Sequence, residues 1–166
     1  DIRPGRAEAL PSPDGSFDLV TFENALHHVT DIARALAEAM RVARHAIVII
    51  DPWFDLSIPS QGGGGPLERW LKKLDRMSGM VHWDPISAGE IVAGCNGARS
   101  VTIRHLLTLT PMSPELFADL ASPGVSHKSN AAYKAGNMDA EFAAIRAESE
   151  RTGITEAGSL LAIIGK

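Results

Sequence analysis

The chain has 166 residues, of which 45% are hydrophobic and 22% charged, a composition typical of one globular domain. It carries 16 basic and 20 acidic residues, for a formal net charge of -4, and no basic run, which argues against binding of nucleic acids. No apolar stretch approaches the roughly 20 residues of a membrane span. A single cysteine cannot form an internal disulfide. We therefore expect a cytoplasmic protein with no nucleic-acid or membrane partner.

The first fifty residues predict a strand, a helix and a second strand. Residues 17–22 are short, apolar and partly β-branched, as in a strand. Thr30 or Asp31 can cap a helix that ends near residue 44. Residues 45–50 (HAIVII) form a continuous apolar run, typical of a parallel strand buried on both faces. This order predicts a right-handed βαβ unit.

Four consecutive glycines occupy residues 62–65. Because glycine loses the most backbone entropy on folding, we expect a flexible loop here, at the boundary between two halves of the chain. A phosphate-binding loop is the alternative, but the run lacks the Gly-Lys-Ser/Thr ending and does not follow a strand. Pro66 suits the first turn of a helix, and the apolar spacing that follows predicts a helix from Pro66 to Met80.

The rest of the chain continues the alternation of helices and strands. Ser87 and Glu90 have the spacing of a capping box, which predicts a short helix ending near Cys95. The remaining elements predicted are a strand over 101–110, a helix from 113, a helix from Asn137 or Asp139 to Gly153, and a strand over 159–164. The fold class is therefore α/β.

Five short phrases in the first part of the chain occur in a characteristic order. They are residues 5–11 (GRAEALP), 13–20 (PDGSFDLV), 25–29 (ALHHV), 41–42 (RV) and 47–51 (IVIID). With this order and spacing the chain resembles class I S-adenosylmethionine-dependent methyltransferases of the small-molecule branch. The resemblance implies a partial Rossmann-like fold, with the fourth to seventh strands of a doubly wound sheet. That sheet is mostly parallel, and its antiparallel last strand lies between the fifth and the sixth.

The resemblance also implies elements that this sequence does not contain. The glycine-rich turn and the acidic residue that hold the cofactor in this family come earlier in the family order than residue 1. We therefore expect one partial domain over 1–166, inactive by itself. Its predicted parts are a cofactor-side βαβ segment (1–59), a lid over the substrate (60–98) and C-terminal strands and helices (99–166).

S-adenosyl-L-methionine is the cofactor that the resemblance implies, and its candidate contacts lie in two segments. The first holds Arg6, Ala7 and Glu8. The family often has Asp at the position of Arg6, to accept a hydrogen bond from adenine, and arginine has donors only. Adenine recognition would then fall to the backbone around Ala7 and to Glu8. The second segment holds Glu23 and Ala25, at the end of the fourth strand; a solvated loop acid is the alternative for Glu23.

Methyl transfer is an in-line displacement in which the protein positions the nucleophile, excludes water and sometimes removes a proton. His27 and His28 follow the fourth strand, and a histidine suits proton removal near neutral pH. The alternative is that this pair begins a helix and packs locally. We therefore name both histidines as candidate catalytic residues. No metal is required, and none is predicted.

The candidate substrate contacts are aromatic residues and one histidine. Trp53 and Phe54 follow the carboxyl end of the fifth strand. We expect them to line a substrate pocket; the alternative is that they are aromatic anchors that cover the sheet. His82 and Trp83 lie in the predicted lid. A metal site formed by His82 and Asp84 would have only two ligands, at the wrong spacing.

Two functions of different classes remain open at this point. One is methyl transfer to a small organic acceptor. The other is a non-catalytic methyltransferase-like module that has lost cofactor binding and mediates interactions. Both predict an exposed edge along the strand at 17–22, and exposed edges tend to be paired or covered. A homo-oligomer formed through this edge is therefore a candidate assembly.

Overall fold

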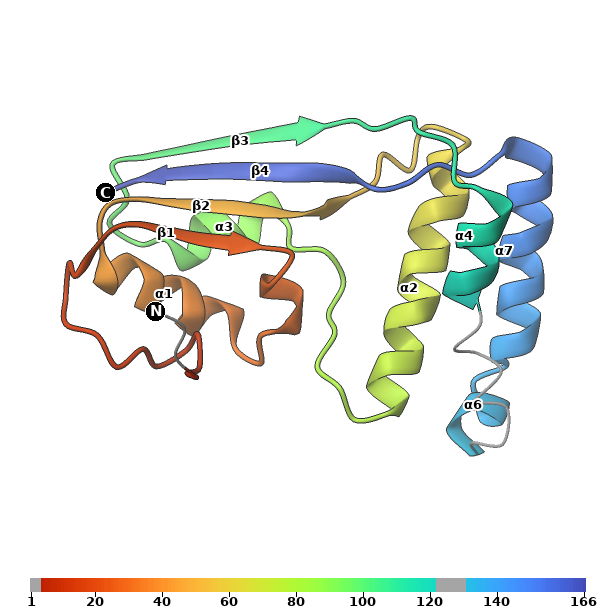
Figure 1. Cartoon of the computed structure of the whole chain (residues 1–166), viewed down its shortest axis with the longest axis horizontal. Helices are drawn as coiled ribbons and strands as arrows, with labels where there is room; N and C mark the ends of the chain where they lie inside the picture. Colours follow the sequence, from red (N-terminus) through yellow and green to blue (C-terminus); the bar gives the residue numbers. More distant parts are fainter. Residues whose placement is uncertain (1–3, 122–130) are drawn as a thin grey trace. The chain divides into compact units, whose positions relative to one another are not determined.

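The computed structural model describes residues 4–121 and 131–166. No helix in these two ranges is long and apolar enough to cross a membrane. The elements, in chain order (Figure 1), are β1 (Phe17–Glu23), the 3-10 helix η1 (Leu26–His28), α1 (Ile32–Val42), β2 (Ala43–Trp53), α2 (Gln61–Met77), α3 (Ala88–Gly94), β3 (Ser100–Leu106), α4 (Pro114–Ala121), α6 (Ala131–Ala135), α7 (Met138–Thr152) and β4 (Gly158–Gly165).

The described strands form one sheet in the order β1-β2-β4-β3. β1 and β2 are parallel, with Leu19 opposite Ala46 and Glu23 opposite Ile50. Figure 1 shows the arrow of β4 running against those of its neighbours. The α/β class, the mixed sheet and the insertion of the last strand between the two before it are thereby confirmed.

The chain divides into two compact units. Unit 1 comprises residues 1–52, 85–106 and 160–166, and holds the sheet with α1 and α3. Unit 2 comprises residues 53–84 and 107–159, and holds α2, α4, α6 and α7. Both units combine segments that lie far apart in the sequence. The division into three successive segments stays a prediction.

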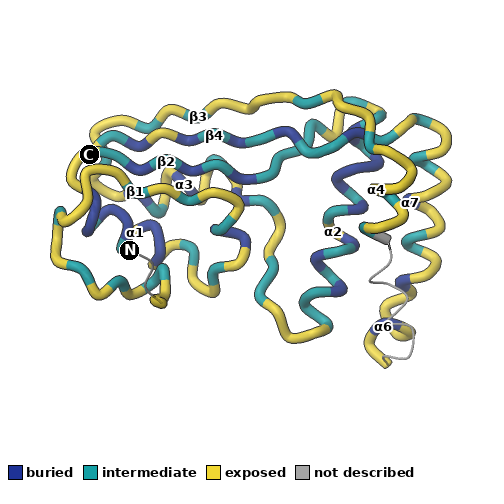
Figure 2. The backbone as a smooth tube through the Cα atoms, in the orientation of Figure 1, coloured by how far each residue is buried: buried dark blue, intermediate teal, exposed yellow. Residues whose placement is uncertain are grey.

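In unit 1, α1 covers one face of the sheet with an apolar stripe. The side chain of Asp31 accepts a hydrogen bond from the backbone N–H of Arg34 (2.9 Å) and so caps the helix, as predicted. The helix ends at Val42, because Ala43 is already extended and begins β2. The residues that α1 buries are Ala35, Leu36, Ala39, Met40 and Val42. Figure 2 shows this helix dark blue along much of its length.

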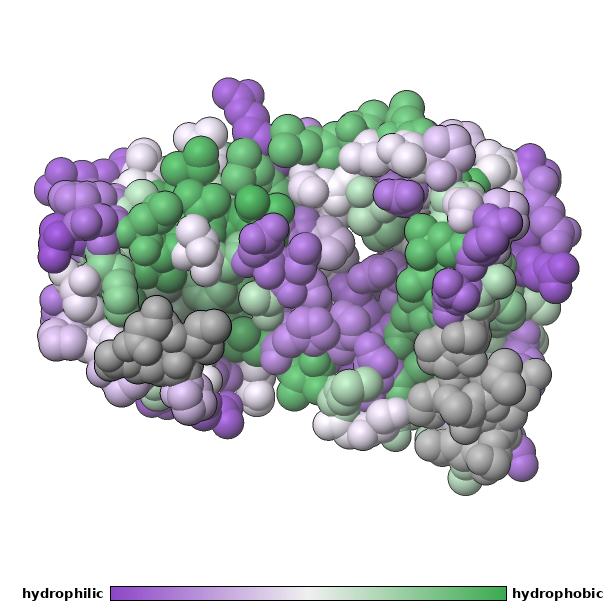
Figure 3. Space-filling view, in the orientation of Figure 1, coloured by the Kyte–Doolittle hydropathy of each residue, from purple (hydrophilic) through white to green (hydrophobic). Residues whose placement is uncertain are grey.

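The strands of unit 1 are buried unequally on their two faces. In β2, Ile47 and Ile49 are buried, while Val48 and Ile50 on the opposite face are only half-buried. The burial on both faces predicted for this strand is therefore wrong for one face. In β1, Phe17 and Leu19 are 46% and 51% exposed. Figure 3 shows hydrophobic residues gathered over these strands.

In unit 2, α2 packs against α6 and α7 around a core of large side chains. Trp70 is buried, and its indole N–H donates to the backbone oxygen of Met138 (3.0 Å), which confirms it as a core residue. Asn137 and Gly153 flank α7, as predicted. The buried core of this unit comprises Leu67, Trp70, Leu74, Tyr133, Met138 and Ile145.

The flexible loop predicted for residues 62–65 is wrong, because these glycines form the first turns of α2. Gly63, Gly64 and Gly65 are buried. A Cβ atom on Gly64 would lie 2.6 Å from Phe54 Cε1 and 2.8 Å from the backbone oxygen of Thr155. Glycine has a low helix propensity, but other residues approach the backbone here too closely to leave room for a side chain. The close packing of this part of the helix therefore depends on glycine.

The helix also begins earlier than predicted, at Gln61 rather than Pro66. Gln61 is fully buried, and its amide fixes three backbone groups of unit 2. Its Nε2 donates to the backbone oxygens of Thr108 (2.7 Å) and Glu156 (3.2 Å), and its Oε1 accepts from the backbone N–H of Asp55 (2.7 Å). This tertiary network sets the start of α2.

Smaller differences concern the ends of two elements. The strand predicted over 101–110 ends at Leu106. The helix predicted to end at Met80 ends at Met77, two residues before Gly79, which has a φ of 81°. The capping box of Ser87 and Glu90 is present. Cys95 is buried, and burial raises the pKa of its thiol, as suits a small core residue.

Candidate functional site

The carboxyl ends of β1 and β2 lie side by side in unit 1. Beyond Glu23, Asn24 adopts a left-handed conformation (φ 48°), which asparagine tolerates better than most residues. The N–H of Asn24 donates to the backbone oxygen of Ile50 (2.8 Å). The chain then turns sharply into η1, so the two histidines are placed beside the end of β2.

His27 and Asp51 form a buried pair at this point. Nδ1 of His27 lies 2.8 Å from Oδ1 of Asp51, and the two side chains are 6% and 1% exposed. A carboxylate oxygen accepts hydrogen bonds, so Nδ1–H of His27 is the donor in this contact. Oδ2 of Asp51 makes no hydrogen bond within the described residues. A histidine held in one tautomer by a carboxylate is an arrangement suited to accepting a proton.

The two histidines differ in their surroundings. His28 is exposed, and the centroid of its ring lies 4.4 Å from that of His27. Sequence reasoning did not assign Asp51 to the site. The signal for it was present, because Asp51 is the first charged residue after the apolar run 46–50.

The candidate cofactor contacts near residue 8 fasten a loop to the start of α1. One oxygen of Glu8, Oε1, accepts hydrogen bonds from the N–H groups of Thr30 (3.2 Å) and Asp31 (3.4 Å). The Arg6 guanidinium reaches the same oxygen at 3.3 Å. Hydrogen bonds from the backbone N–H groups of Glu8 itself and of Asp31 lower the pKa of this carboxyl. Ala7 is half-buried in the same loop.

These positions differ in how they fit a bound S-adenosylmethionine. Glu23 is exposed and Ala25 half-buried at the end of β1, where open α/β sheets bind their ligands. Both therefore fit a cofactor lining. Glu8 fits less well as an acceptor for adenine, because Oε1 is already bonded within the loop and only Oε2 would remain for a ligand.

The substrate contacts predicted in unit 2 lie in two places. Nδ1 of His82 lies 2.5 Å from Oδ2 of Asp75, a contact that ties the loop after α2 to the end of that helix. Trp83, next in the chain, is 44% exposed. Trp53 is half-buried at the end of β2. Phe54 packs on the glycines of α2 and lines a cavity of about 190 Å³ in this unit.

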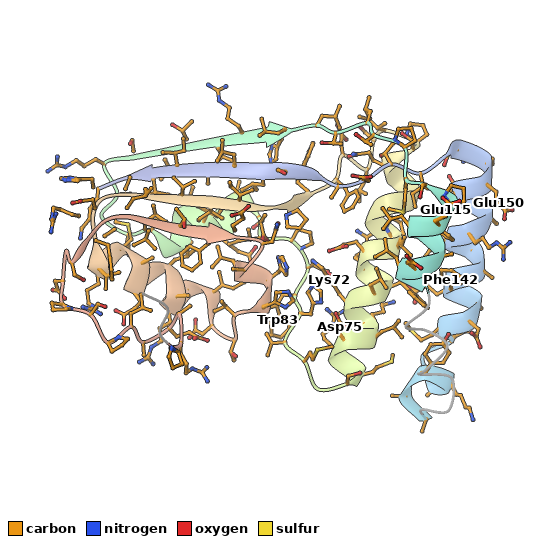
Figure 4. All side chains as sticks on the ribbon, viewed as in Figure 1. Lys72, Asp75, Trp83, Glu115, Phe142 and Glu150 are labelled. Carbon is orange, nitrogen blue, oxygen red and sulfur yellow. The ribbon has the colours of Figure 1, made fainter. Side chains whose placement is uncertain are left out.

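A larger cavity, about 680 Å³, lies between α4 and α7, and sequence reasoning did not predict it. Phe117 and Phe142 form part of its wall, with their ring centroids 5.8 Å apart and the rings stacked. Arg146 and Glu150 also line it and form an exposed ion pair (3.0 Å). Figure 4 shows Phe142 and Glu150 on α7 and Glu115 on α4. The cavity is large enough for a small organic ligand.

Comparison with known proteins gives a sequence match at the start of the chain. Residues 1–50 match a family described as "Methyltransferase domain". The ubiquinone/menaquinone biosynthesis C-methyltransferase UbiE of Methylobacterium nodulans is 57% identical over 42 residues. The uncharacterized methyltransferase YcgJ of Bacillus subtilis is 48% identical over 40 residues. These matches cover 25% and 24% of this chain, and only 17% and 16% of the length of the two relatives.

Solved structures match the fold over nearly the whole chain. The crystal structure of Bacillus subtilis YcgJ matches with a TM-score of 0.52 and 20% identity, over 97% of this chain and 68% of that one. A putative methyltransferase from Bacillus halodurans matches with a TM-score of 0.50 and 13% identity, over 97% and 68% of the two chains. The resemblance to class I S-adenosylmethionine-dependent methyltransferases is thereby confirmed, in sequence for the first fifty residues and in fold beyond them.

Proposed function

We propose that this chain is part of an S-adenosylmethionine-dependent methyltransferase that acts on a small organic acceptor by in-line methyl transfer. The observation that supports a catalytic role most directly is the buried pair of His27 and Asp51 at the end of the parallel strands. S-adenosylmethionine, when bound, supplies the methyl group from its sulfonium centre. The residues of this chain would position the acceptor and remove its proton.

In this proposal His27 accepts the proton at Nε2 from a hydroxyl or an acidic carbon of the acceptor. Asp51 holds the imidazole ring in place and fixes its tautomer, and burial of the pair keeps bulk water away from it. His28 is the alternative proton acceptor. Glu23 and Ala25 would line the cofactor, and Arg6, Ala7 and Glu8 would border its adenine. Trp53, Phe54, His82 and Trp83 are the proposed acceptor contacts.

Titration calorimetry with S-adenosylhomocysteine tests this proposal. We expect the 166 residues to show no micromolar binding, because they contain neither the glycine-rich turn nor the acidic residue with which the family holds the cofactor. We expect binding once a segment that carries the family's glycine-rich turn is fused before residue 1. The control is the same fusion with valines in place of the turn glycines, and it should not bind.

Two other outcomes would change the proposal. Micromolar binding by the 166 residues alone would mean that other groups complete the cofactor site. No binding by either form would leave the second candidate, a non-catalytic methyltransferase-like module that mediates interactions. The exposed apolar residues of β1 are the observation that favours this module.

We also propose that β1 pairs with a second copy of the chain. In the part of the chain that the structure describes, β1 lies at one end of the strand order and pairs with β2 alone. Phe17 and Leu19 on this edge strand are exposed, and the strand contains no proline that would block pairing with another strand. Its register with β2 shifts between Phe17 and Leu19, so we propose that the new pairing runs along the regular part, from Leu19 to Glu23.

Light scattering coupled to gel filtration checks this pairing. We expect a dimer for the native sequence and a monomer for Leu19→Lys, because a lysine on an edge strand disfavours pairing. Leu106→Lys on β3 is the control, since Leu106 is also 51% exposed and lies on the opposite edge strand. A monomer at high concentration for the native sequence would contradict the proposal.

A further inference from the structure

Lys72 in α2 is a fully buried lysine, with 0% of its side chain exposed. Lysine is almost never fully buried unless it is paired. Within the described residues its Nζ makes no hydrogen bond, and its ion pair is with Glu68, 3.3 Å away and one turn earlier. An ammonium group has three N–H donors. The ion pair with Glu68 therefore offsets only part of the free-energy cost of removing the Lys72 ammonium group from water.

The adjacent lysine shows what complete pairing looks like on the same helix. Nζ of Lys73 lies 2.7 Å from both carboxylate oxygens of Glu141, although Lys73 is 43% exposed. On this helix the exposed lysine is hydrogen-bonded, whereas the buried lysine makes no hydrogen bond to the described residues. A buried ammonium without hydrogen bonds is destabilising. A ligand with hydrogen-bond acceptors would supply the partners that the described residues do not give to Nζ of Lys72.

The charged groups near Lys72 limit what that group can be. By their spacing of three or four residues, four charged residues share its side of the helix. They are Glu68, Arg69, Asp75 and Arg76, and Arg69 is exposed. Asp75 pairs with His82, and the Arg76 guanidinium donates to the backbone oxygen of His82. Figure 4 marks Lys72 and Asp75 on α2. The buried cation on this side is therefore Lys72 alone among the described residues, and it faces the carboxylate of Glu68. One buried cation suits a ligand with a single negative charge better than a phosphate dianion.

Glu68 gives a ligand a way to reach the lysine. Its side chain is 27% exposed, whereas the side chain of Lys72, 3.3 Å away, is fully buried. Nζ of Lys72 makes no hydrogen bond to the described residues, so its 3.3 Å contact with Glu68 is an ion pair without hydrogen-bond geometry. A small carboxylate can take its position as Glu68 turns outward, and can accept the hydrogen bonds that Glu68 does not.

We infer that Lys72 binds the carboxylate of a small organic acid, in the place that Glu68 occupies in the unliganded protein. This inference rests on the proposed function to the extent that the acid would be the methyl acceptor. Lys72 would then make the protein bind acidic acceptors in preference to neutral ones. Lys72 lies in unit 2, and its binding of the acid does not require the cofactor.

Benzoate is the probe, with benzamide as its neutral counterpart, and titration calorimetry measures both. We expect the 166-residue chain to bind benzoate and not benzamide. Lys72→Met keeps the volume of the side chain and removes its charge, and should weaken benzoate binding by about tenfold or more. Lys73→Met, with the same change on an exposed neighbour, should leave it unchanged. Glu68→Gln removes the competing carboxylate and should strengthen it.

Thermal unfolding by circular dichroism shows whether each variant is folded. Replacing a buried charge by an apolar group of similar volume is often neutral or stabilising, so Lys72→Met should melt no earlier than the native chain. Equal benzoate binding by Lys72→Met and the native chain would overturn the inference, as would weaker binding by Glu68→Gln. Failure of the native chain to bind benzoate would do the same. None of these results depends on S-adenosylhomocysteine, so the inference and the proposed function can fail separately.

Discussion

Replacing Asp51 with alanine is expected to lower the free energy of unfolding by about 3 kcal/mol, among the largest losses for a single change in unit 1. The substitution removes the acceptor of the Nδ1–H of His27, and both side chains are buried, so water does not replace it. Asp51→Asn keeps one acceptor oxygen and should lose less. Urea unfolding followed by circular dichroism measures the loss, and amide exchange in β2 assigns it to unit 1.

Asp18→Ala is the matched control, because Asp18 forms an ion pair with Arg44 at the surface and is 70% exposed. An exposed pair contributes little, so this variant should stay within about 0.5 kcal/mol of the native chain. Equal losses for Asp18→Ala and Asp51→Ala would contradict the importance of the buried pair. Nitrogen NMR of His27 adds a separate readout, since the native chain should show the Nδ1-protonated tautomer and Asp51→Ala should not.

The second large effect is expected where α2 begins. Gly64→Ala should destabilise the protein by about 2 kcal/mol, because its Cβ would meet a backbone oxygen that cannot move aside easily. That oxygen belongs to Thr155 and would lie 2.8 Å away, with the ring of Phe54 at 2.6 Å. The tryptophans of the chain, Trp53, Trp70 and Trp83, all lie in unit 2, so their fluorescence reports its unfolding in urea.

Gly62→Ala is the matched control in the same turn. No atom of the described residues outside its own surroundings lies within 4 Å of the Cβ position at Gly62. Alanine has the higher helix propensity, so this variant should gain about 0.5 to 1 kcal/mol. If both alanines shift stability in the same direction, close packing is not the reason for the glycines in α2.

The candidate site could be predicted only in part. The position of His27 and His28 after β1 follows from the apolar pattern and the resemblance, since the end of a strand is a local feature. That His27 is buried against Asp51 while His28 faces solvent depends on the turn at Asn24 and on the pairing of β1 with β2. The cavity between α4 and α7 left no signal in the sequence, because it is lined by residues far apart in the chain. The burial of Lys72 was not predicted either.

By itself, the sequence determined the order and type of most elements, the α/β class and the resemblance to methyltransferases. It could do so because apolar periodicity, helix caps and turns are properties of short segments. Only the tertiary structure decided that residues 62–65 are helical. Locally, four glycines favour a loop. In the folded chain, Phe54 and the backbone at Thr155 leave no room for side chains there, so the glycines that disfavour a helix are the residues that allow this one to pack.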